Sequence, residues 1–379
     1  MTDSLGRLVG PPVQCHQADV VIVGAGPSGA TAAACLARRG WRVAVVGPRP
    51  GAVARGETLA AEARSVLAGA GLWELVERLG RPCHSSWSVW GTPWPHRRDP
   101  LAGPWGPPWH VDVGRLTDAL LDLAVRFGAR LYPGRARVGR GGAPAAVSFE
   151  LDGGQEEVTA GFLLDASGRA ALGARAFGAS RLTVDHQVAV TTWMRVDSPA
   201  VSTLVEATET GWWSTLADAG RLYLNYFTDP DLLPRPLALD AELRGAPHTA
   251  ARVRAAGRGA RPRLAVTSGS VLNRVAGCGW AAIGDAAATF DPLAGMGLHH
   301  ALNSAVTAAD AVHGALLGTE DGLDDYARSE RDLFHEHLRA RRRRYAAEGR
   351  WADRPFWRRR TRRVVPERPA RRPVSLCPC

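Results

Sequence analysis

The sequence predicts an α/β fold, and three neighbouring segments carry that prediction. Residues 18–23 form a short β-branched run, typical of a buried parallel strand, and residues 30–39 are rich in alanine at helical spacing. Between them lies a glycine turn, residues 24–29, with the pattern G-x-G-x-x-G. A strand, a glycine turn and a helix, followed by a second strand at residues 42–46, indicate a Rossmann-like dinucleotide-binding domain.

Each glycine of this turn has a separate expected purpose. Gly24 permits the tight turn, Gly26 lets a pyrophosphate approach bare backbone, and Gly29 lets the helix and strand pack closely. The helix N-terminus, which includes Ser28, then faces the phosphates. We therefore expect Gly24, Gly26, Ser28 and Gly29 to bind the cofactor. An ordinary glycine turn of an α/β protein is the alternative, and the strand and helix around the turn make it the weaker one.

Two motifs lie in the distal half of the chain. Residues 279–287 predict a strand that ends in Gly-Asp, and residues 291–298 form a turn, Asp-Pro-x-x-Gly-x-Gly, before a helix over residues 299–316. Together with the first turn, they resemble the flavin-dependent monooxygenase and halogenase superfamily. The resemblance implies FAD as the cofactor, with Asp285 on the ribityl chain. Asp285 as a helix cap without a ligand stays open as an alternative.

The resemblance also gives the second turn a purpose. It implies that Pro292, Gly295, Met296 and Gly297 bring backbone amides to the pyrimidine edge of the flavin. A helix start offers unpaired N–H groups and a partial positive charge, which would stabilise an anionic reduced flavin.

Further motifs of the same superfamily lie between these two. Residues 162–169 look like its central Asp-Gly motif, and residues 56–59 resemble its Gly-Glu-Ser-Leu stretch. Arg115, before a helix expected over residues 116–127, stands where relatives place an arginine near the FAD pyrophosphate. A guanidinium suits that contact because it pairs planar oxygens bidentately and keeps its charge. The implied fold is a Rossmann-like FAD-binding domain (GR2 type) with an interleaved antiparallel β-sheet substrate domain and a C-terminal helical segment.

The expected domain division follows from these motifs. Residues 17–183 and 264–318 would be the two parts of the FAD-binding domain, with inserted strands at about residues 84–112. Residues 184–263 would form the substrate sheet, from strands over 186–196 and 203–228 with a hairpin turn at 217–220. Residues 319–379 would be C-terminal helices and a basic tail.

The sequence departs from the superfamily pattern at two points. After the strand at residues 42–46, many relatives carry an acidic residue for the ribose, but this chain has Arg49, which either contacts adenine or phosphate or is a solvated loop residue. The chain also has no lysine, whereas flavin halogenases are understood to use one. Halogenation is therefore disfavoured. The stretch at residues 87–94 is tryptophan-rich but lacks the halogenase spacing, and we expect a strand and loop over the flavin there.

The expected substrate contacts are aromatic and imidazole side chains. Strand alternation puts Trp212 and Trp213 on opposite faces, so one of them would face the substrate, unless both are core residues. His299 and His300 follow the Asp-Pro-x-x-Gly-x-Gly turn at residues 291–298, which we call the flavin turn. They either contact the substrate or face away. No side chain could be assigned as catalytic. The six cysteines show neither zinc-ligand spacing nor a disulfide framework, so no metal site is predicted.

Composition and charge limit the remaining possibilities. The 379 residues are 45% hydrophobic, with no membrane-spanning run and no signal peptide, so we expect a cytoplasmic enzyme. The net charge of +10 comes from the end of the chain, since residues 339–379 hold fifteen arginines. We expect solvated basic helices there, anchored by Trp351, Phe356 and Trp357. A docking surface for an acidic partner comes second, and nucleic acid is disfavoured because no recognised binding module is present.

The resemblance implies an FAD-dependent monooxygenase, in which a flavin C4a-hydroperoxide hydroxylates an electron-rich aromatic ring or an indole. Residues 211–229 look most similar to short halogenase-like flavoproteins that oxidise tryptophan during maturation of quinone-cofactor oxidases. The implied partners are O₂, an aromatic substrate, free or on a protein, and NAD(P)H or a flavin reductase. A small-molecule hydroxylase of a natural-product pathway and a non-catalytic FAD-binding protein remain as alternatives.

Overall fold

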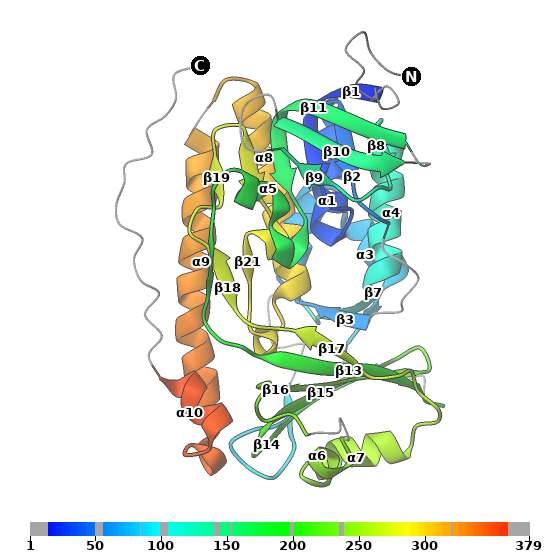
Figure 1. Cartoon of the computed structure of the whole chain (residues 1–379). Helices are drawn as coiled ribbons and strands as arrows, with labels where there is room; N and C mark the ends of the chain where they lie inside the picture. Colours follow the sequence, from blue (N-terminus) through cyan, green and yellow to red (C-terminus); the bar gives the residue numbers. More distant parts are fainter. Residues whose placement is uncertain are drawn as a thin grey trace, which may run out of the picture.

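A computed structural model describes residues 14–49, 56–83, 85–98, 105–139, 145–151, 154–197, 201–234, 239–319 and 321–362. Figure 1 shows two main layers, a Rossmann-like layer above and an antiparallel sheet below, with one long helix running alongside both. The expected α/β class with a Rossmann-like domain is confirmed.

The upper layer is an eight-stranded mixed sheet. Its parallel centre has the order β20-β11-β1-β2-β8, and β19, β10 and β9 extend it by antiparallel pairing. The last residues of β1, all of β2 and the end of β11 are buried and mainly apolar, as strands between two covered faces require. These strands are β1 (Gln14–Val23), β2 (Val43–Val46), β8 (Arg130–Tyr132), β9 (Arg137–Val138), β10 (Ala145–Leu151), β11 (Gly154–Asp165), β19 (Ala276–Gly277) and β20 (Trp280–Ala282).

Three helices pack together beside this sheet. They are α1 (Pro27–Arg38), α4 (Val113–Arg126) and α8 (Gly297–Leu316), and α1 contacts both of the others. Their apolar faces and the strands share one buried core. Because α1 consists mainly of alanine and other small residues, its neighbours can approach closely on every side.

The lower layer is a seven-stranded sheet of order β17-β13-β16-β15-β14-β5-β6, antiparallel except where β14 meets β5. The predicted hairpin is confirmed: Ala219 and Gly220 join β15 to β16, both with positive φ. On its outer face lie α6 (Asp240–Arg244) and α7 (Pro247–Arg254). The strands are β5 (Ser86–Val89), β6 (His96–Arg98), β13 (Val188–Arg195), β14 (Ser202–Thr208), β15 (Gly211–Asp218), β16 (Arg221–Thr228) and β17 (Arg263–Val266).

Two small sheets connect the layers. One has the order β3-β7-β4, from Gly56–Leu59, Trp109–Asp112 and Arg81–Pro82, and the other has the order β12-β18-β21, from Arg181–Thr183, Ser270–Leu272 and Ala288–Thr289. Short helices α2 (Ala63–Gly69), α3 (Trp73–Leu79) and α5 (Leu172–Ala176) fill the upper layer, while α9 (Asp321–Ala346) and α10 (Pro355–Thr361) close the chain beside both layers.

Within the described residues, no helix combines the length and the apolar character needed to cross a membrane. The four cysteines of the described part, Cys15, Cys35, Cys83 and Cys278, form no disulfide there. The boundaries that we expect between the FAD-binding and substrate domains stay a proposal.

Candidate active site

The first glycine turn is shaped by packing at two of its three glycines. Gly24 has φ of +113°, and a Cβ there would overlap the carbonyl oxygen of Ala166. A Cβ on Gly29 would overlap the carbonyl oxygen of Gly24. Gly26 differs, because a Cβ on it would have no atom within 4 Å. Packing therefore requires Gly24 and Gly29, while the backbone at Gly26 lies open to a ligand.

The helix that follows this turn, α1, has no side chain that caps its N-terminus. Its N-cap is Gly26, no side chain accepts from its first N–H groups, and no acidic residue lies in its first turn. Such an end attracts phosphate through free N–H groups and the helix dipole. Ser28 is buried here, and a Cβ on Gly284 would lie 2.8 Å from its Oγ atom. The Gly-Asp motif therefore packs directly on the start of α1.

Asp285 lies in a short 3₁₀ turn over Gly284–Ala286, and its carboxylate is 48% exposed. Among the described residues the Asp285 carboxylate accepts no hydrogen bond, and its nearest cation is the Arg169 guanidinium, with 3.9 Å between Nε and Oδ2. The residue that precedes this turn, Ile283, is its N-cap, and no side chain caps it. The structure therefore gives the carboxylate no capping contact and leaves it available to a ligand hydroxyl.

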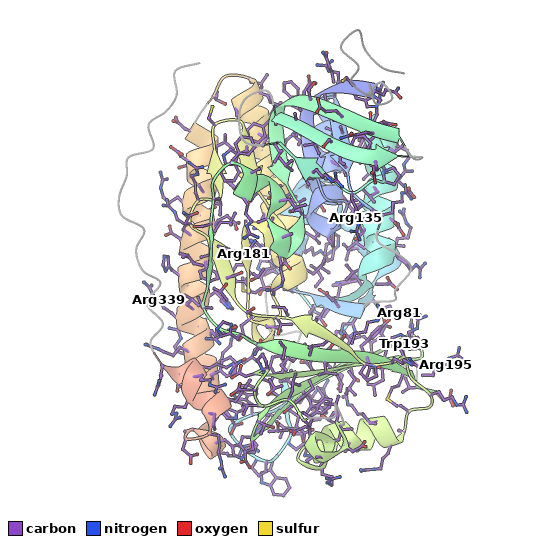
Figure 2. The ribbon with its side chains drawn as sticks, viewed as in Figure 1. Arg81, Arg135, Arg181, Trp193, Arg195 and Arg339 are labelled. Carbon is purple, nitrogen blue, oxygen red and sulfur yellow. The ribbon has the colours of Figure 1, made fainter. Side chains whose placement is uncertain are left out.

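Two arginines that the sequence did not single out surround this aspartate. Arg169, from the central Asp-Gly motif, also donates to the Ser268 carbonyl, and Arg181 of β12 donates to the carbonyls of Asp285 and Ala286. Figure 2 shows Arg181 in the middle of the molecule, between the layers. Burial lowers the pKa of both guanidiniums from the usual arginine value. They make this region electropositive, as an anionic dinucleotide requires.

The central Asp-Gly motif stabilises its own turn. Asp165 is fully buried and accepts hydrogen bonds from the Ser167 amide and hydroxyl and from the Ala174 amide. Burial raises the pKa of this carboxyl. The motif contributes to the site mainly through the Ala166 contact with Gly24 and through the Arg169 side chain.

The flavin turn leads into a second uncapped helix. Pro292 opens a 3₁₀ turn, Gly295 has φ of +64°, and α8 begins after Met296 with no capping side chain and no acidic residue in its first turn. A Cβ on Gly295 or Gly297 would meet nothing within 4 Å. The amides of this turn are therefore accessible, which fits the proposed contact with the flavin pyrimidine edge.

Arg49 and Arg115 lie at the edges of the site. A cavity of about 200 Å³ beyond the end of β2 is lined by Arg49 together with Ala25, Val45, Gly47, Leu131 and Pro133. Arg49 is half exposed and lies 3.3 Å from Asp122 on α4, so the apolar cavity with this cation at its edge suits an adenine ring. Arg115 is exposed on the first turn of α4, whose N-cap Asp112 accepts from the Arg115 amide.

Trp212 and Trp213 lie on opposite faces of the lower sheet, and both are buried. Trp212 stacks on Phe227, with 4.0 Å between ring centroids, on the face that also contacts Leu293 of the flavin turn. Trp213 packs against Tyr226 on the face that α6 and α7 cover. Trp212 is therefore near the flavin turn, although it is enclosed by protein, and Trp213 lies behind the sheet.

The face of the lower sheet toward the FAD-binding layer carries a row of partly exposed side chains that sequence reasoning missed. Thr191, Asn225, Ser214 and Val205 are paired across four neighbouring strands. On β16, Asn225 lies between Phe227, which belongs to the Leu293 cluster, and Tyr223, whose ring lies against Gly56. Period-two alternation from Trp212 could have identified Ser214 and, one strand on, Asn225.

The small sheet of the connecting layer meets the lower sheet at one end of this face. Nε of Arg81, on β4, lies 3.9 Å from the Asp218 carboxylate of β15, and the Arg221 guanidinium lies over the Trp193 ring. Figure 2 labels Arg81 and Trp193 on this side of the molecule. The Arg81–Asp218 ion pair therefore connects the two sheets on that side.

The two histidines after the flavin turn have different surroundings. His300 is buried, and its Nε2 atom lies 2.8 Å from the Glu330 carboxylate of α9, which outweighs burial and raises the pKa of the imidazole. His299 is partly exposed, and burial lowers the pKa of its ring. Of the two, His299 is the one that a substrate could reach. The part of the chain described here contains no cluster suited to a metal ion.

The C-terminal helices pack with aromatic anchors. Phe356 and Trp357 are fully buried, while Trp351 is only partly buried and stacks on Trp357. The last part of the expected basic tail, residues 363–379, lies outside the described residues, and so do Cys377 and Cys379.

Three sequence motifs far apart in the chain thus surround one region: an uncapped helix start for phosphates, a free carboxylate with two arginines, and a second uncapped helix start. This fold and site define a FAD-dependent oxidoreductase. A sequence model of the family described as "FAD binding domain" matches residues 17–229, more than half of the chain, and the chain belongs to this family. FAD is its cofactor.

Three known proteins are similar over most of the chain. LodB of Marinomonas mediterranea, named as a FAD-dependent oxidoreductase, is 25% identical over 364 residues, which cover 90% of this chain and 96% of LodB. A tryptophan 2-halogenase of Chondromyces crocatus is 28% identical, covering 80% of this chain and 62% of the halogenase. The solved structure of QhpG, a peptidyl tryptophan dihydroxylase of tryptophylquinone cofactor biogenesis, is 25% identical with a TM-score of 0.70, covering 91% of this chain and 79% of QhpG.

Proposed function

We propose that this protein is a FAD-dependent monooxygenase that hydroxylates an electron-rich aromatic ring, and that this ring is a tryptophan side chain of a partner protein. One observation carries the proposal: Asn225 and Ser214 make a partly polar patch on the same face of the lower sheet as the Trp212–Phe227 cluster, which Leu293 of the flavin turn contacts. A substrate held on this face would lie next to the redox cofactor. Reduced FAD, together with O₂, would supply the electrophilic oxygen atom.

The protein's own residues would position the reactants. Asp285 and the amides of the two uncapped helix starts would hold the cofactor, and Arg169 and Arg181 would balance its charge. Asn225 and Ser214 would orient the substrate by hydrogen bonds, because neither side chain makes one with the rest of the described protein. His299, the partly exposed histidine nearest the turn, is our candidate to accept a proton from the substrate.

The indole substrate is supported by two relatives rather than by the fold. QhpG acts on peptidyl tryptophan, and the relative from Chondromyces crocatus is a tryptophan 2-halogenase. Halogenase relatives exist as well, but this chain contains no lysine that could take up a hypohalous acid. Reducing equivalents would come from NAD(P)H or from a flavin reductase, and the lack of a disulfide among the described cysteines suits a reducing compartment such as the cytoplasm.

The decisive experiment supplies the FAD-loaded protein with a reductase, NADH and isotopically labelled O₂. Separate reactions contain a synthetic peptide with one central tryptophan, free tryptophan, or indole. We expect labelled oxygen in the peptide, detected by tandem mass spectrometry on the tryptophan residue. Labelled free tryptophan or indole alone would favour the small-molecule alternative. Hydrogen peroxide as the sole oxygen product with every substrate would contradict the monooxygenase proposal.

A matched variant tests the substrate face. Asn225→Leu removes the amide in the centre of the face and keeps a similar volume, whereas Leu222→Met changes a buried residue on the opposite face of the same strand. We expect the first change to raise KM or to increase peroxide release without changing FAD affinity, and the second to leave both unchanged.

A further inference from the structure

The buried surroundings of Asp291, the first residue of the flavin turn, are not explained by cofactor binding. Its side chain is 1% exposed, so it cannot reach the open side of the turn. Burial alone would raise the pKa of this carboxyl, but the nearby Arg341 guanidinium outweighs that effect and holds the pKa below its usual value. Asp291 is therefore an ionised carboxylate in the interior, and such a group needs several partners.

These partners come mainly from one helix. Arg341 of α9 donates from Nε to Asp291 at 2.8 Å, and the hydroxyl of Tyr345, one turn later, donates to the same carboxylate at 3.0 Å. On the same helix, His337 accepts the Asp291 amide through Nε2. The remaining contact is local, because Asp291 also accepts from the Leu293 amide inside the turn. Side chain and main chain of Asp291 are thus both held by α9.

The same two side chains of α9 also reach the lower sheet. The Tyr345 hydroxyl accepts hydrogen bonds from the Trp212 indole N–H at 3.1 Å and from the Gln187 amide at 3.2 Å. Arg341 donates from a terminal nitrogen to Asp185 at 2.5 Å, in the segment that leads into β13. Each side chain therefore connects the flavin turn to the sheet.

We propose that Tyr345 is a positioning residue: its hydroxyl connects the Asp291 carboxylate to Trp212 and Gln187, and so fixes the amides of the flavin turn relative to the substrate sheet. Arg341 makes a parallel connection through Asp185. The turn itself is open at Gly295 and Gly297, and no side chain caps the helix α8 that follows it. Its position is therefore set from behind, through the buried Asp291, rather than by contacts on the cofactor side.

A further buried ion pair, on the neighbouring helix α10, fixes the position of α9. Arg360 of α10 is buried, lies over the Phe356 ring, and donates to Asp229 at the end of β16. Because α10 packs on α9, this pair fixes the end of α9 that carries Tyr345 against the sheet.

The test uses the FAD-loaded full chain and compares Tyr345→Phe with Tyr226→Phe. Both changes remove one buried hydroxyl, but that of Tyr226 bonds Thr210 and Glu242 on the outer side of the sheet. We expect Tyr345→Phe alone to speed hydrogen exchange in peptides covering residues 291–300 about tenfold and to raise the FAD dissociation constant by a similar factor. If the Tyr345 hydroxyl only stabilised the fold, both variants would lose similar global stability. Hydrogen exchange at residues 291–300 and the FAD dissociation constant would then be the same in the two variants.

A second variant keeps the test decisive if Tyr345→Phe does not fold. Gln187→Leu removes one donor to the Tyr345 hydroxyl and contacts no atom of the turn through its amide. We expect a smaller increase in exchange at residues 291–300 and none in the control. If Gln187→Leu, and Tyr345→Phe where it folds, match Tyr226→Phe in exchange and FAD affinity, the proposal is wrong. Neither readout needs turnover, so failure here is distinct from failure of the monooxygenase proposal.

Discussion

At the scale of single residues, the glycines of the first turn differ in what requires them: packing requires Gly24 and Gly29, whereas we expect cofactor binding to require Gly26. Gly26→Val places a side chain where the structure has no atom within 4 Å, so we expect the protein to fold but to lose FAD binding, because the pyrophosphate can no longer approach the backbone. Flavin absorbance and a fluorescence titration measure the loss. Gly29→Ala is the contrast, since its Cβ would overlap the Gly24 carbonyl and we expect a lower melting temperature. Unchanged FAD affinity in Gly26→Val would contradict the cofactor site.

Asp285 allows a similar test of the ribityl contact. Its carboxylate is about half exposed and makes no hydrogen bond among the described residues, so Asp285→Ala should change global stability little. We expect FAD binding to weaken by about 1.5–3 kcal/mol, the usual cost of losing a hydrogen bond to a charged group. Asp325→Ala, which removes an exposed carboxylate paired with Arg328 on α9, is the control. Equal affinities in the two variants would show that Asp285 does not hold the cofactor.

Because of the buried His110 on β7, we expect the free energy of unfolding to fall in acid. Its ring is buried, neither nitrogen has a partner among the described residues, and burial lowers its pKa from 6.5 to about 4. The folded state therefore binds fewer protons than the unfolded state below pH 6.5, and stability is lost as the pH falls. This histidine should cost about 2 kcal/mol of unfolding free energy between pH 7 and pH 5.

Urea unfolding at both pH values checks this prediction. His110→Leu removes the titrating group, so the variant should lose about 2 kcal/mol less than the unaltered protein on acidification. The difference between the two proteins isolates His110 from other groups, including His337, whose pKa burial also lowers to about 4. Equal losses would mean that the His110 ring is hydrated in solution.

At the scale of elements, α10 is held by ion pairs of unequal depth: Arg360 pairs with Asp229, and Arg359 pairs with both Asp229 and Asp231. Asp229 and Arg360 are both at most 5% exposed, whereas Asp231 and Arg359 are about half exposed. Asp229→Asn should therefore destabilise the protein by about 3 kcal/mol, because it leaves a buried guanidinium without its counter-charge. Asp231→Asn should cost at most about 1 kcal/mol. Thermal unfolding of the two variants provides the comparison, and equal shifts would argue against a buried pair.

Elements with strong local patterns were predictable from the sequence. The β-branched strand, glycine turn and alanine-rich helix at the start of the chain are confirmed, and so is the hairpin at Ala219 and Gly220. These features depend on neighbours within a few residues, which the sequence displays directly. The parallel pairing of β5 with β14 was not predictable, because nothing local indicates that residues 86–89 would join a sheet formed mainly from residues 188–228.

The site was predictable only in part, because some of its contacts join residues that are far apart in the sequence. Glycine and aspartate motifs identify cofactor contacts because backbone geometry and charge demand those residue types. Tyr345 and Arg341 belong to no motif, and their link to Asp291 spans at least fifty residues of sequence. Trp213 was a reasonable substrate candidate by residue type, but strand direction turns it toward α6 and α7. Tertiary packing alone determines such contacts.

At the scale of the whole molecule, the lack of lysine in the sequence predicts that the protein does not halogenate tryptophan. With FAD, a flavin reductase and bromide or chloride, we expect no halogenated product from free tryptophan, since the chain has no lysine to form a haloamine or to donate a hydrogen bond to hypohalous acid. Mass spectrometry of the reaction mixture decides the matter, with the isotope pattern of bromine as the marker. Brominated tryptophan would overturn this prediction.

The pairing of β11 with β20 determines how late in synthesis the cofactor site can be completed. A nascent chain that ends before residue 280 already carries the glycine turn, but it lacks β20, Asp285, the flavin turn and the α9 residues that hold Asp291. FAD can therefore meet a complete site only after almost the entire polypeptide has left the ribosome. Until then β10 covers only the first part of this edge of β11, and residues 163–165, which later pair with β20, have no partner strand there. A scarce flavin supply would prolong this stage, at which chaperones and proteases compete for the chain.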